Sequence, residues 1–191
     1  MSINLPNQEN CLKLLDKYGT SSERFKVIKE HSITVANASV FLAKRLKDAG
    51  ENIDVSLVKV GALLHDIGKA ESIKQDFKID HALEGYKILI KEGLPKEVAL
   101  IAKNHLRMYL KKCKTWEEKI IIYVDCCAER DKIISIEKRN KKLIERYKNT
   151  SIDVEKELKE AQPLLNKIEK EIFSKINLKP EELAKYVANE N

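Results

Sequence analysis

The sequence predicts an all-α fold, a helical bundle followed by a charged helical extension. Only six of the 191 residues are glycine and four are proline, while 43% are hydrophobic and 35% are charged. Apolar residues recur at three- and four-residue steps, which is the spacing of amphipathic helices. No alternating apolar and polar stretch bounded by turn residues competes with this pattern, so we expect no β-strand.

Capping residues delimit the first two helices. We expect a short helix from Gln8 to Tyr18 that Gly19 ends. Ser22 can cap a second helix from Glu23 to Ala49. The inward apolar stripe of this second helix includes His31, so the histidine should face the core.

Aspartate residues can cap the next two helices. A helix that starts after Asp54 carries His65 near its end and should stop at Gly68. Asp80 can cap a further helix from His81 to Glu92. Both histidines therefore lie at helix ends.

A proline and a capping box start two more helices. Pro95 suits the first turn of a helix from Pro95 to about Tyr109. Thr115-Trp116-Glu117-Glu118 forms a capping box and opens a helix that bears Asp125. We expect both helices to pack on the preceding ones.

The composition changes after Arg130. The segment from Asp131 to Lys175 is strongly charged and carries a sparse apolar stripe at heptad-like spacing. A solvated helix laid over the bundle is the simpler interpretation, and a dimerisation helix is the alternative, although only two heptads are visible. Pro163 should kink or restart this helix, and Pro180 should start a last one from Glu181 to Ala188. We therefore divide the chain into a bundle, residues 1–147 with its core at about 20–147, and an extension, residues 148–191.

Composition also bounds the setting and the partners. The N-terminus has no basic and apolar leader, and no apolar run approaches the ~20 residues that span a bilayer, so we expect a cytoplasmic protein without membrane association. The four cysteines form no Cys-x-x-Cys pair, which favours reduced thiols over disulfides or a zinc site. The net charge of +6 favours an anionic partner such as a phosphorylated metabolite.

The four histidines and two aspartates are the candidate metal ligands. His65 and Asp66 are adjacent and follow an apolar run, and Asp125 also lies at the end of one. Imidazole nitrogens and carboxylate oxygens form the mixed ligand set that transition metals accept. A lone histidine is more often a hydrogen-bonded core residue, but a buried His-Asp pair must be satisfied, and metal ligation would satisfy it. Asp131 is a less favoured substitute for Asp125, because no apolar run leads into it.

These ligands divide into two expected sites that share Asp66. The first comprises His31, His65, Asp66 and Asp125, and the second comprises the other oxygen of Asp66 with His81 and His105. Two cations about 3.5–4 Å apart can activate water against a phosphorus centre that both of them hold. Whether the site takes one or two divalent ions stays open, and Mn, Fe, Zn, Co, Ni or Mg all suit it.

The ordered set of His31, His65-Asp66 and Asp125 resembles the HD-domain metal-dependent phosphohydrolase superfamily. His65-Asp66-Ile67-Gly68 is similar to the HDIG variant of its motif, and the resemblance covers about residues 20–147. It implies an HD-domain-like helical bundle that binds divalent cations and hydrolyses phosphate esters or anhydrides. His81 and His105 match positions at which two-metal members carry further histidines.

A narrower resemblance concerns the stretch from Glu118 to Arg130, which is similar to that of the HD-type symmetrical diadenosine-tetraphosphate hydrolases. That family usually has a threonine where this chain has Leu106, so the metal site transfers better than the substrate. The histidine pair of cyclic-di-GMP phosphodiesterases is absent from the sequence.

Lys69 and Arg107 are the candidate phosphate ligands. Several two-metal members keep a lysine at the position of Lys69, where it would neutralise charge on a transferring phosphoryl group, and a solvated lysine at a helix end is the alternative. Arg107 belongs to a basic stretch that could hold a nucleotide tail or could simply be a solvated face. A role for Asp66 in orienting the attacking water is a further alternative, but a bridging carboxylate is poorly basic, so we expect the metals to do most of the activation.

The sequence thus favours a metal-dependent phosphohydrolase acting on a nucleotide or small phosphate ester. One alternative is a ligand-sensing or scaffolding module that binds metal and a phosphorylated ligand without turnover; a homodimer formed through the charged segment would fit this alternative. Another is RNA binding or RNA end processing, against which the aromatic residues are scattered rather than interleaved with arginines. Nucleic acid is therefore not the expected partner.

Overall fold

A computed structural model describes residues 4–20, 22–75, 79–149 and 153–188. For residues 186–188 it describes the backbone only. It confirms the all-α fold. The described helices are α1 (Gln8–Tyr18), α2 (Glu23–Asp48), α3 (Val55–Leu64), α4 (Lys69–Lys74), α5 (His81–Lys91), α6 (Lys96–Asn104), α7 (Trp116–Cys127), α8 (Ile136–Tyr147), α9 (Val154–Phe173) and α10 (Leu183–Ala188), with 3₁₀ turns η1 (Arg107–Lys112) and η2 (Pro180–Glu182).

The predicted caps account for where these helices start. The side chain of Ser22 accepts from the backbone of Phe25, and Asp54 and Asp80 each accept from two backbone N–H groups of the first turn. Thr115 and Glu118 form the reciprocal capping box at the start of α7. Each cap satisfies donors that a helix cannot pair internally.

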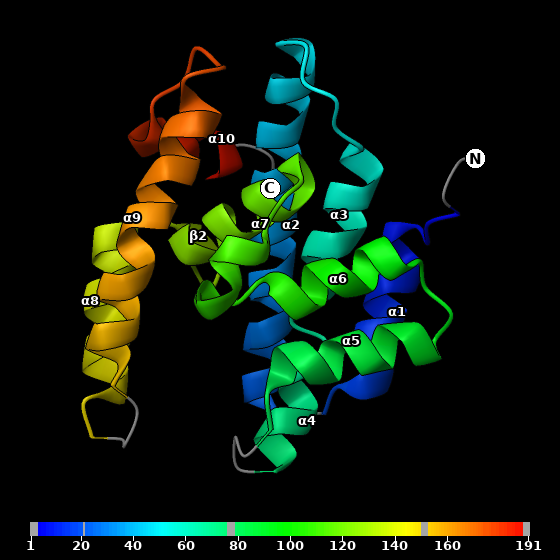
Figure 1. Cartoon of the computed structure of the whole chain (residues 1–191). Coiled ribbons are helices and arrows are strands. Elements are labelled where there is room, and N and C mark those ends of the chain that lie inside the picture. The colour runs from blue at the N-terminus through cyan, green and yellow to red at the C-terminus, as the bar shows by residue number, and fades with distance from the viewer. Residues whose placement is uncertain (1–3, 21, 76–78, 150–152, 189–191) are drawn as a thin grey trace.

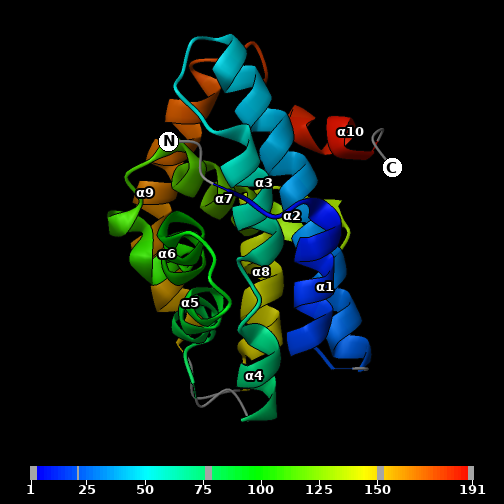
Figure 2. The ribbon, with the colours of Figure 1, turned by 90° about the vertical axis from the view of Figure 1, so that its right-hand side faces the viewer.

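Helix α2 runs through the middle of the molecule, with α3 against it and α8 and α9 side by side at the left (Figure 1). In the view turned by 90°, α6 and α1 lie on opposite sides of α3, and α5 stacks under α6 (Figure 2). The core between them is aliphatic, and the most deeply buried side chains include Leu42, Leu64 and Ile121. Among the described helices, none is both long and apolar enough to cross a membrane.

The helix predicted to reach Tyr109 ends earlier, so that expectation was wrong. Helix α6 stops at Asn104, Leu106 is extended with ψ 145°, and η1 follows. The ring of His105 explains the break, because its Nδ1 donates to the carbonyl of Ala102 and takes up an acceptor at the end of the helix. The same hydrogen bond fixes the direction of the imidazole.

Two short strands were not expected either. β1 (Ala128–Glu129) and β2 (Lys132–Ile133) pair antiparallel, with Ala128 opposite Ile133 and Glu129 opposite Lys132. A two-residue strand is too short to show an alternating pattern in the sequence. Arg130, in the turn, has φ 54°, a backbone conformation that side chains other than glycine rarely adopt.

Pro163 does not restart the helix that contains it. Helix α9 continues from Val154 to Phe173, and Pro163 lies on its exposed side, where water can serve the carbonyl that the proline leaves unpaired. The apolar stripe predicted on this helix faces the rest of this chain: Leu158, Ala161, Leu165, Ile168 and Ile172 are all buried. The stripe is therefore already covered without a second copy.

Candidate metal centre

The six predicted metal ligands converge from five helices. His31 lies within α2, and His65 and Asp66 directly follow α3. His81 is the first residue of α5, His105 directly follows α6, and Asp125 lies in the last turn of α7. The four imidazole rings form a continuous row, with neighbouring centroids 5.4, 5.0 and 5.2 Å apart in the order His31, His65, His105, His81.

The carboxylate of Asp66 lies in the middle of this row and is fully buried. Its Oδ2 is 3.4 Å from Nε2 of His65 and 3.8 Å from Nε2 of His31. Its Oδ1 is 3.2 Å from Nε2 of His105 and 3.5 Å from Nε2 of His81. The two oxygens of one carboxylate therefore face different pairs of histidines.

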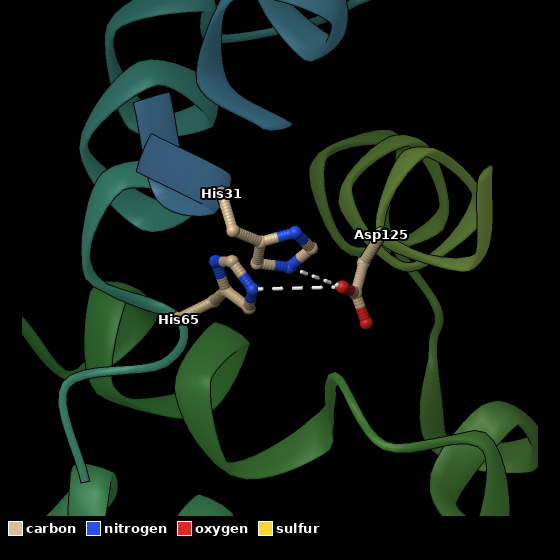
Figure 3. Close-up of side chains that lie close together, drawn as sticks. All are labelled: His31, His65 and Asp125. Atoms are coloured by element: carbon tan, nitrogen blue, oxygen red, sulfur yellow. Dashed lines mark hydrogen bonds and ion pairs between the residues drawn. The ribbon is translucent and has the colours of Figure 1, made fainter. Parts of the chain in front are cut away.

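Asp125 closes one end of the row. Its Oδ1 is 2.8 Å from Nε2 of His31 and 3.7 Å from Nε2 of His65 (Figure 3). One ligand atom from each of these three residues lies within 4.8 Å of the others, and the same holds for His65, Asp66 and His105. These distances are of the size that a cation between the ligand atoms can bridge.

Backbone hydrogen bonds fix the tautomers of two histidines. Nδ1 of His65 lies 2.6 Å from the carbonyl of Ala62, and Nδ1 of His105 lies 2.6 Å from that of Ala102. A carbonyl can only accept, so Nδ1 carries the proton, and in a neutral ring the lone pair of Nε2 then points toward the carboxylate of Asp66. Such second-shell hydrogen bonds are typical of histidines that ligate metals.

Three buried polar atoms at the centre have no hydrogen-bond partner, namely Nε2 of His65, Nε2 of His81 and Oδ1 of Asp66. A lone pair that faces a carboxylate oxygen at this depth is destabilising unless a positive charge lies between the two atoms. The donor set of nitrogens and oxygens suits first-row divalent metals. The residues present therefore fit a divalent metal.

The charges of the centre are strongly coupled. Burial opposes ionisation of Asp66, yet the positive charges of Lys69 and His65 hold the pKa of that carboxyl well below its usual value. Burial lowers the pKa of His65, but Asp66 and Asp125 outweigh it and raise the pKa to about 10. Burial lowers the pKa of His31, and it lowers that of His81 to about 3. In this state a proton on His65 supplies positive charge that a metal would otherwise supply.

Lys69 supplies a second positive charge. Its Nζ lies 2.5 Å from Oδ2 of Asp66, the oxygen that faces His31 and His65. Burial disfavours its charge, but Asp66 and Asp125 outweigh that and raise the pKa of the ammonium. Lys69 thus stays charged and occupies the carboxylate oxygen that the first predicted metal would use.

The centre opens into a cavity of about 440 Å³. Its lining includes His31 and Asp66 from the centre and an apolar side made of Val27, Ile28, Ile73 and Tyr147. Its cationic lining comprises Arg24, Lys69, Arg130, Arg139 and Arg146. This excess of positive charge suits an anionic ligand.

Arg107 is not among the residues that line this cavity. Its guanidinium donates to Oδ1 of Asn140 at 2.7 Å, and the residue borders another cavity, next to Glu157 and Glu160. Sequence reasoning instead missed Arg24, Arg139 and Arg146. The seven-residue spacing of the last two, on one face of a helix, was a signal that could have found them.

Gly68 allows the ligands on either side of it to approach. A Cβ at this position would lie 2.1 Å from the carbonyl oxygen of His81 and 2.5 Å from the backbone nitrogen of Gly85. Only glycine lets the start of α5 pack this closely on the segment that follows Asp66. The glycine of the His-Asp-Ile-Gly motif thereby places His81 beside Asp66.

Comparisons with known proteins identify relatives of this chain. The chain is 37% identical over 102 residues to a tRNA (cytidine(56)-2′-O)-methyltransferase of Thermoplasma volcanium, covering 53% of this chain and 26% of that protein. It is 33% identical over 110 residues to the uncharacterized protein MJ0778 of Methanocaldococcus jannaschii, covering 50% of this chain and 63% of the relative. A second tRNA (cytidine(56)-2′-O)-methyltransferase, from Picrophilus torridus, is 27% identical over 186 residues, covering 89% of this chain and 47% of the relative.

The chain thus spans less than two thirds of the length of each of these relatives. No solved structure gives a significant match. The HD domain family matches residues 28–150, well over half of the chain and a range that contains all six candidate ligands. The chain belongs to the HD domain family.

Proposed function

We propose that this HD domain protein is a metal-dependent phosphohydrolase that hydrolyses a nucleotide or another small phosphate ester or anhydride. The observation that carries the proposal is the placement of Asp66, whose two carboxylate oxygens face separate histidine pairs. One carboxylate shared in this way suits two neighbouring cations, an arrangement typical of phosphoryl-group hydrolysis. The cationic cavity at the same centre suits a phosphate.

His31, His65, Asp66 and Asp125 would hold one cation, and Asp66, His81 and His105 would hold the other. When bound, divalent ions polarise a phosphoryl group and lower the pKa of water. Ions of Mn, Fe, Zn, Co, Ni or Mg match this nitrogen and oxygen set.

Lys69 is the residue of this chain that would act on the phosphoryl group itself. Its ammonium lines the cavity beside Asp66 and keeps its proton, because the pKa is raised. Once Asp66 serves as a metal ligand, the ammonium of Lys69 would no longer be needed to neutralise it and would be free to donate to a phosphoryl oxygen. Charge that develops on the transferring group would then be stabilised by a fixed donor in a partly buried site.

A second candidate function is the processing of an RNA end at the same centre. The names of two relatives, both tRNA methyltransferases, favour it over other polymer substrates. A ligand-sensing module that binds metal and a phosphorylated ligand without turnover is the non-enzymatic alternative.

The experiment that tests the proposal combines metal content with turnover. Elemental analysis of wild type and of His81→Ala, purified without chelating resin, should give about two metals falling toward one. Metal-loaded protein is then assayed on nucleoside monophosphates, dinucleoside polyphosphates, phosphodiesters and a tRNA fragment with a terminal phosphate. Release of phosphate from small nucleotides supports the proposal, and cleavage of the tRNA fragment alone would favour the second candidate. Metal loading with no turnover of any substrate would favour the sensing module.

A further inference from the structure

The cavity at the metal centre has a second cationic wall, which the metal site does not use. It is formed by Arg139 and Arg146, which are seven residues apart on α8. Two turns of helix place both side chains on the same face. This wall comes from an element that carries none of the six candidate ligands.

Glu129, in β1, forms ion pairs with the guanidinium groups of both arginines. Arg146 contacts one of its carboxylate oxygens at 3.0 Å, and Arg139 forms a shorter hydrogen bond to the other. The side chain of Glu129 is 12% exposed and that of Arg139 is 14% exposed, whereas that of Arg146 is 48% exposed. Two arginines anchored by one carboxylate are preorganised to bind an anion and retain a positive charge.

The cavity carries more positive charge than its own carboxylates neutralise. Lys69 is paired with Asp66, and Glu129 can neutralise only one of its two arginines. One charge of that pair therefore remains, together with those of Arg24 and Arg130 on the same lining. A phosphate held at the metal centre would leave the positive charge of this wall in place, and a second anionic group of the same ligand would pair with it.

We propose that Arg139 and Arg146 form a second phosphate subsite, so that the substrate is a nucleotide with at least two phosphate groups. One phosphate is cleaved at the metal centre and the other is held by α8; this assignment of the first phosphate rests on the proposed function. The apolar side of the cavity, with Tyr147 and Ile73, suits a base or ribose. The two phosphates belong either to one phosphoanhydride chain or to two positions of a ribose.

The competing explanation is purely structural: the ion pairs of Glu129 with Arg139 and Arg146 anchor α8 to the hairpin formed by β1 and β2. Binding of defined probes by the full-length, manganese-loaded protein separates the two. Isothermal titration uses adenosine monophosphate and the α,β-methylene analogue of adenosine diphosphate, whose phosphates cannot be cleaved from each other. Adenosine 3′,5′-bisphosphate is the third probe, and it distinguishes a phosphate across the ribose from one along a chain.

The variants are Arg139→Gln, Arg146→Gln and the double variant, with Lys141→Gln as the matched control. Lys141 is on the same helix, but its ammonium is paired with Glu137 and it does not line the cavity. The double variant should lose about 10- to 100-fold in affinity for a two-phosphate probe, since each arginine makes a charge-assisted hydrogen bond to the second phosphate. Affinity for the monophosphate should change less than about threefold, and the control should match wild type.

Equal losses for one- and two-phosphate probes, or none beyond those of Lys141→Gln, would overturn the subsite. A drop in melting temperature without the selective loss would show that the tie to Glu129 is only structural. These outcomes are independent of turnover: the selective loss can occur in a protein that hydrolyses nothing, which would reject the proposed function and keep the subsite. Hydrolysis of small nucleotides by wild type, together with no selective loss for two-phosphate probes in the double variant, would do the reverse: it would keep the proposed function and reject the subsite.

Discussion

A single carboxylate, Asp66, connects every part of the candidate centre. It faces all four histidines and is paired with Lys69. Its replacement by alanine should therefore empty both cation sites at once, with hydrolysis lost and the helices retained. Elemental analysis, phosphate release and far-ultraviolet circular dichroism together measure this outcome.

The control for this variant is Asp16→Ala, because Asp16 is an exposed carboxylate paired with Lys29. It should keep the full metal content. Activity that survives in Asp66→Ala would contradict the assigned chemistry.

Lys69 competes with metal for the same oxygen of Asp66. Its replacement should therefore change metal affinity and hydrolysis rate in opposite directions. In Lys69→Gln the ammonium no longer lies 2.5 Å from Oδ2 of Asp66, so affinity for manganese should rise by about tenfold, the equivalent of a modest charged hydrogen bond. Hydrolysis should nevertheless fall, because the donor to the phosphoryl group is gone. Titration with a metal indicator dye and steady-state rates at saturating manganese measure the two effects. A variant that loses metal affinity and rate together would contradict the competition.

The pH dependence of metal binding follows from His65. With its pKa raised to about 10, this ring is protonated at neutral pH and must release that proton to ligate a metal. His31 and His81 release none there, because their pKa values are lowered. Affinity for metal should therefore increase with pH, by about tenfold per unit between pH 7 and 9. Competition titrations of metal against a chelator at several pH values, corrected for buffer and hydroxide, measure this dependence. An affinity that does not change with pH would contradict the release of a proton from His65.

The candidate ligands could be singled out in the sequence because the chain has only four histidines and because two of its aspartates stand at the end of apolar runs. Asp66 and Asp125 follow such runs and His31 lies on an apolar stripe, so folding the core necessarily brought them inward. Arg107 could not be placed in the same way, because its side chain belongs to a polar face whose direction depends on the break at Asn104. The structure directs it to Asn140 instead.

At the scale of elements, the starts of the helices were predictable from their capping residues. The end of α6 was not, because a side chain there takes up a backbone acceptor of the helix. Ser22, Asp54, Asp80 and Thr115 act on the backbone within three residues, so local sequence determines them. The early end of α6 depends instead on the ring of His105, which contacts Asp66 in the turn after α3, far away in the sequence.

Gly68 and Gly85 provide a matched pair of substitutions at the contact between α5 and the ligand segment. Alanine at 68 would place its Cβ 2.1 Å from the backbone oxygen of His81, whereas alanine at 85 finds ordinary contacts at 3.5 Å. Gly68→Ala should displace the start of α5, lower stability by about 1–3 kcal/mol and, if His81 ligates a cation as proposed, reduce the metal content. Gly85→Ala should keep both properties. Metal content and denaturant unfolding of the two variants measure the difference, and equal behaviour would refute this role of Gly68.

At the scale of the whole molecule, the question is whether the C-terminal extension is separable from the bundle. Leu165, Ile172 and Leu183 are fully buried within it. Tyr123 of α7 donates to Glu169 of α9 at 2.9 Å, two residues before Asp125 in the sequence of α7. The helix that carries the candidate ligand Asp125 thus packs directly on the extension, which predicts one cooperative unit.

Leu165→Ala tests that unity. Removing a fully buried leucine should lower the free energy of unfolding by about 2–5 kcal/mol, while Lys167→Ala, on an exposed position of the same helix, should change it by less than about 0.5 kcal/mol. Unfolding in urea is followed by helix content and by release of manganese. If the extension is part of one core, both signals shift together to lower denaturant concentration, because α7 cannot keep Asp125 in place once α9 detaches. Loss of helix at a concentration that leaves the metal bound would instead establish the extension as a separate unit, and the division near residue 147 would then be a true domain boundary.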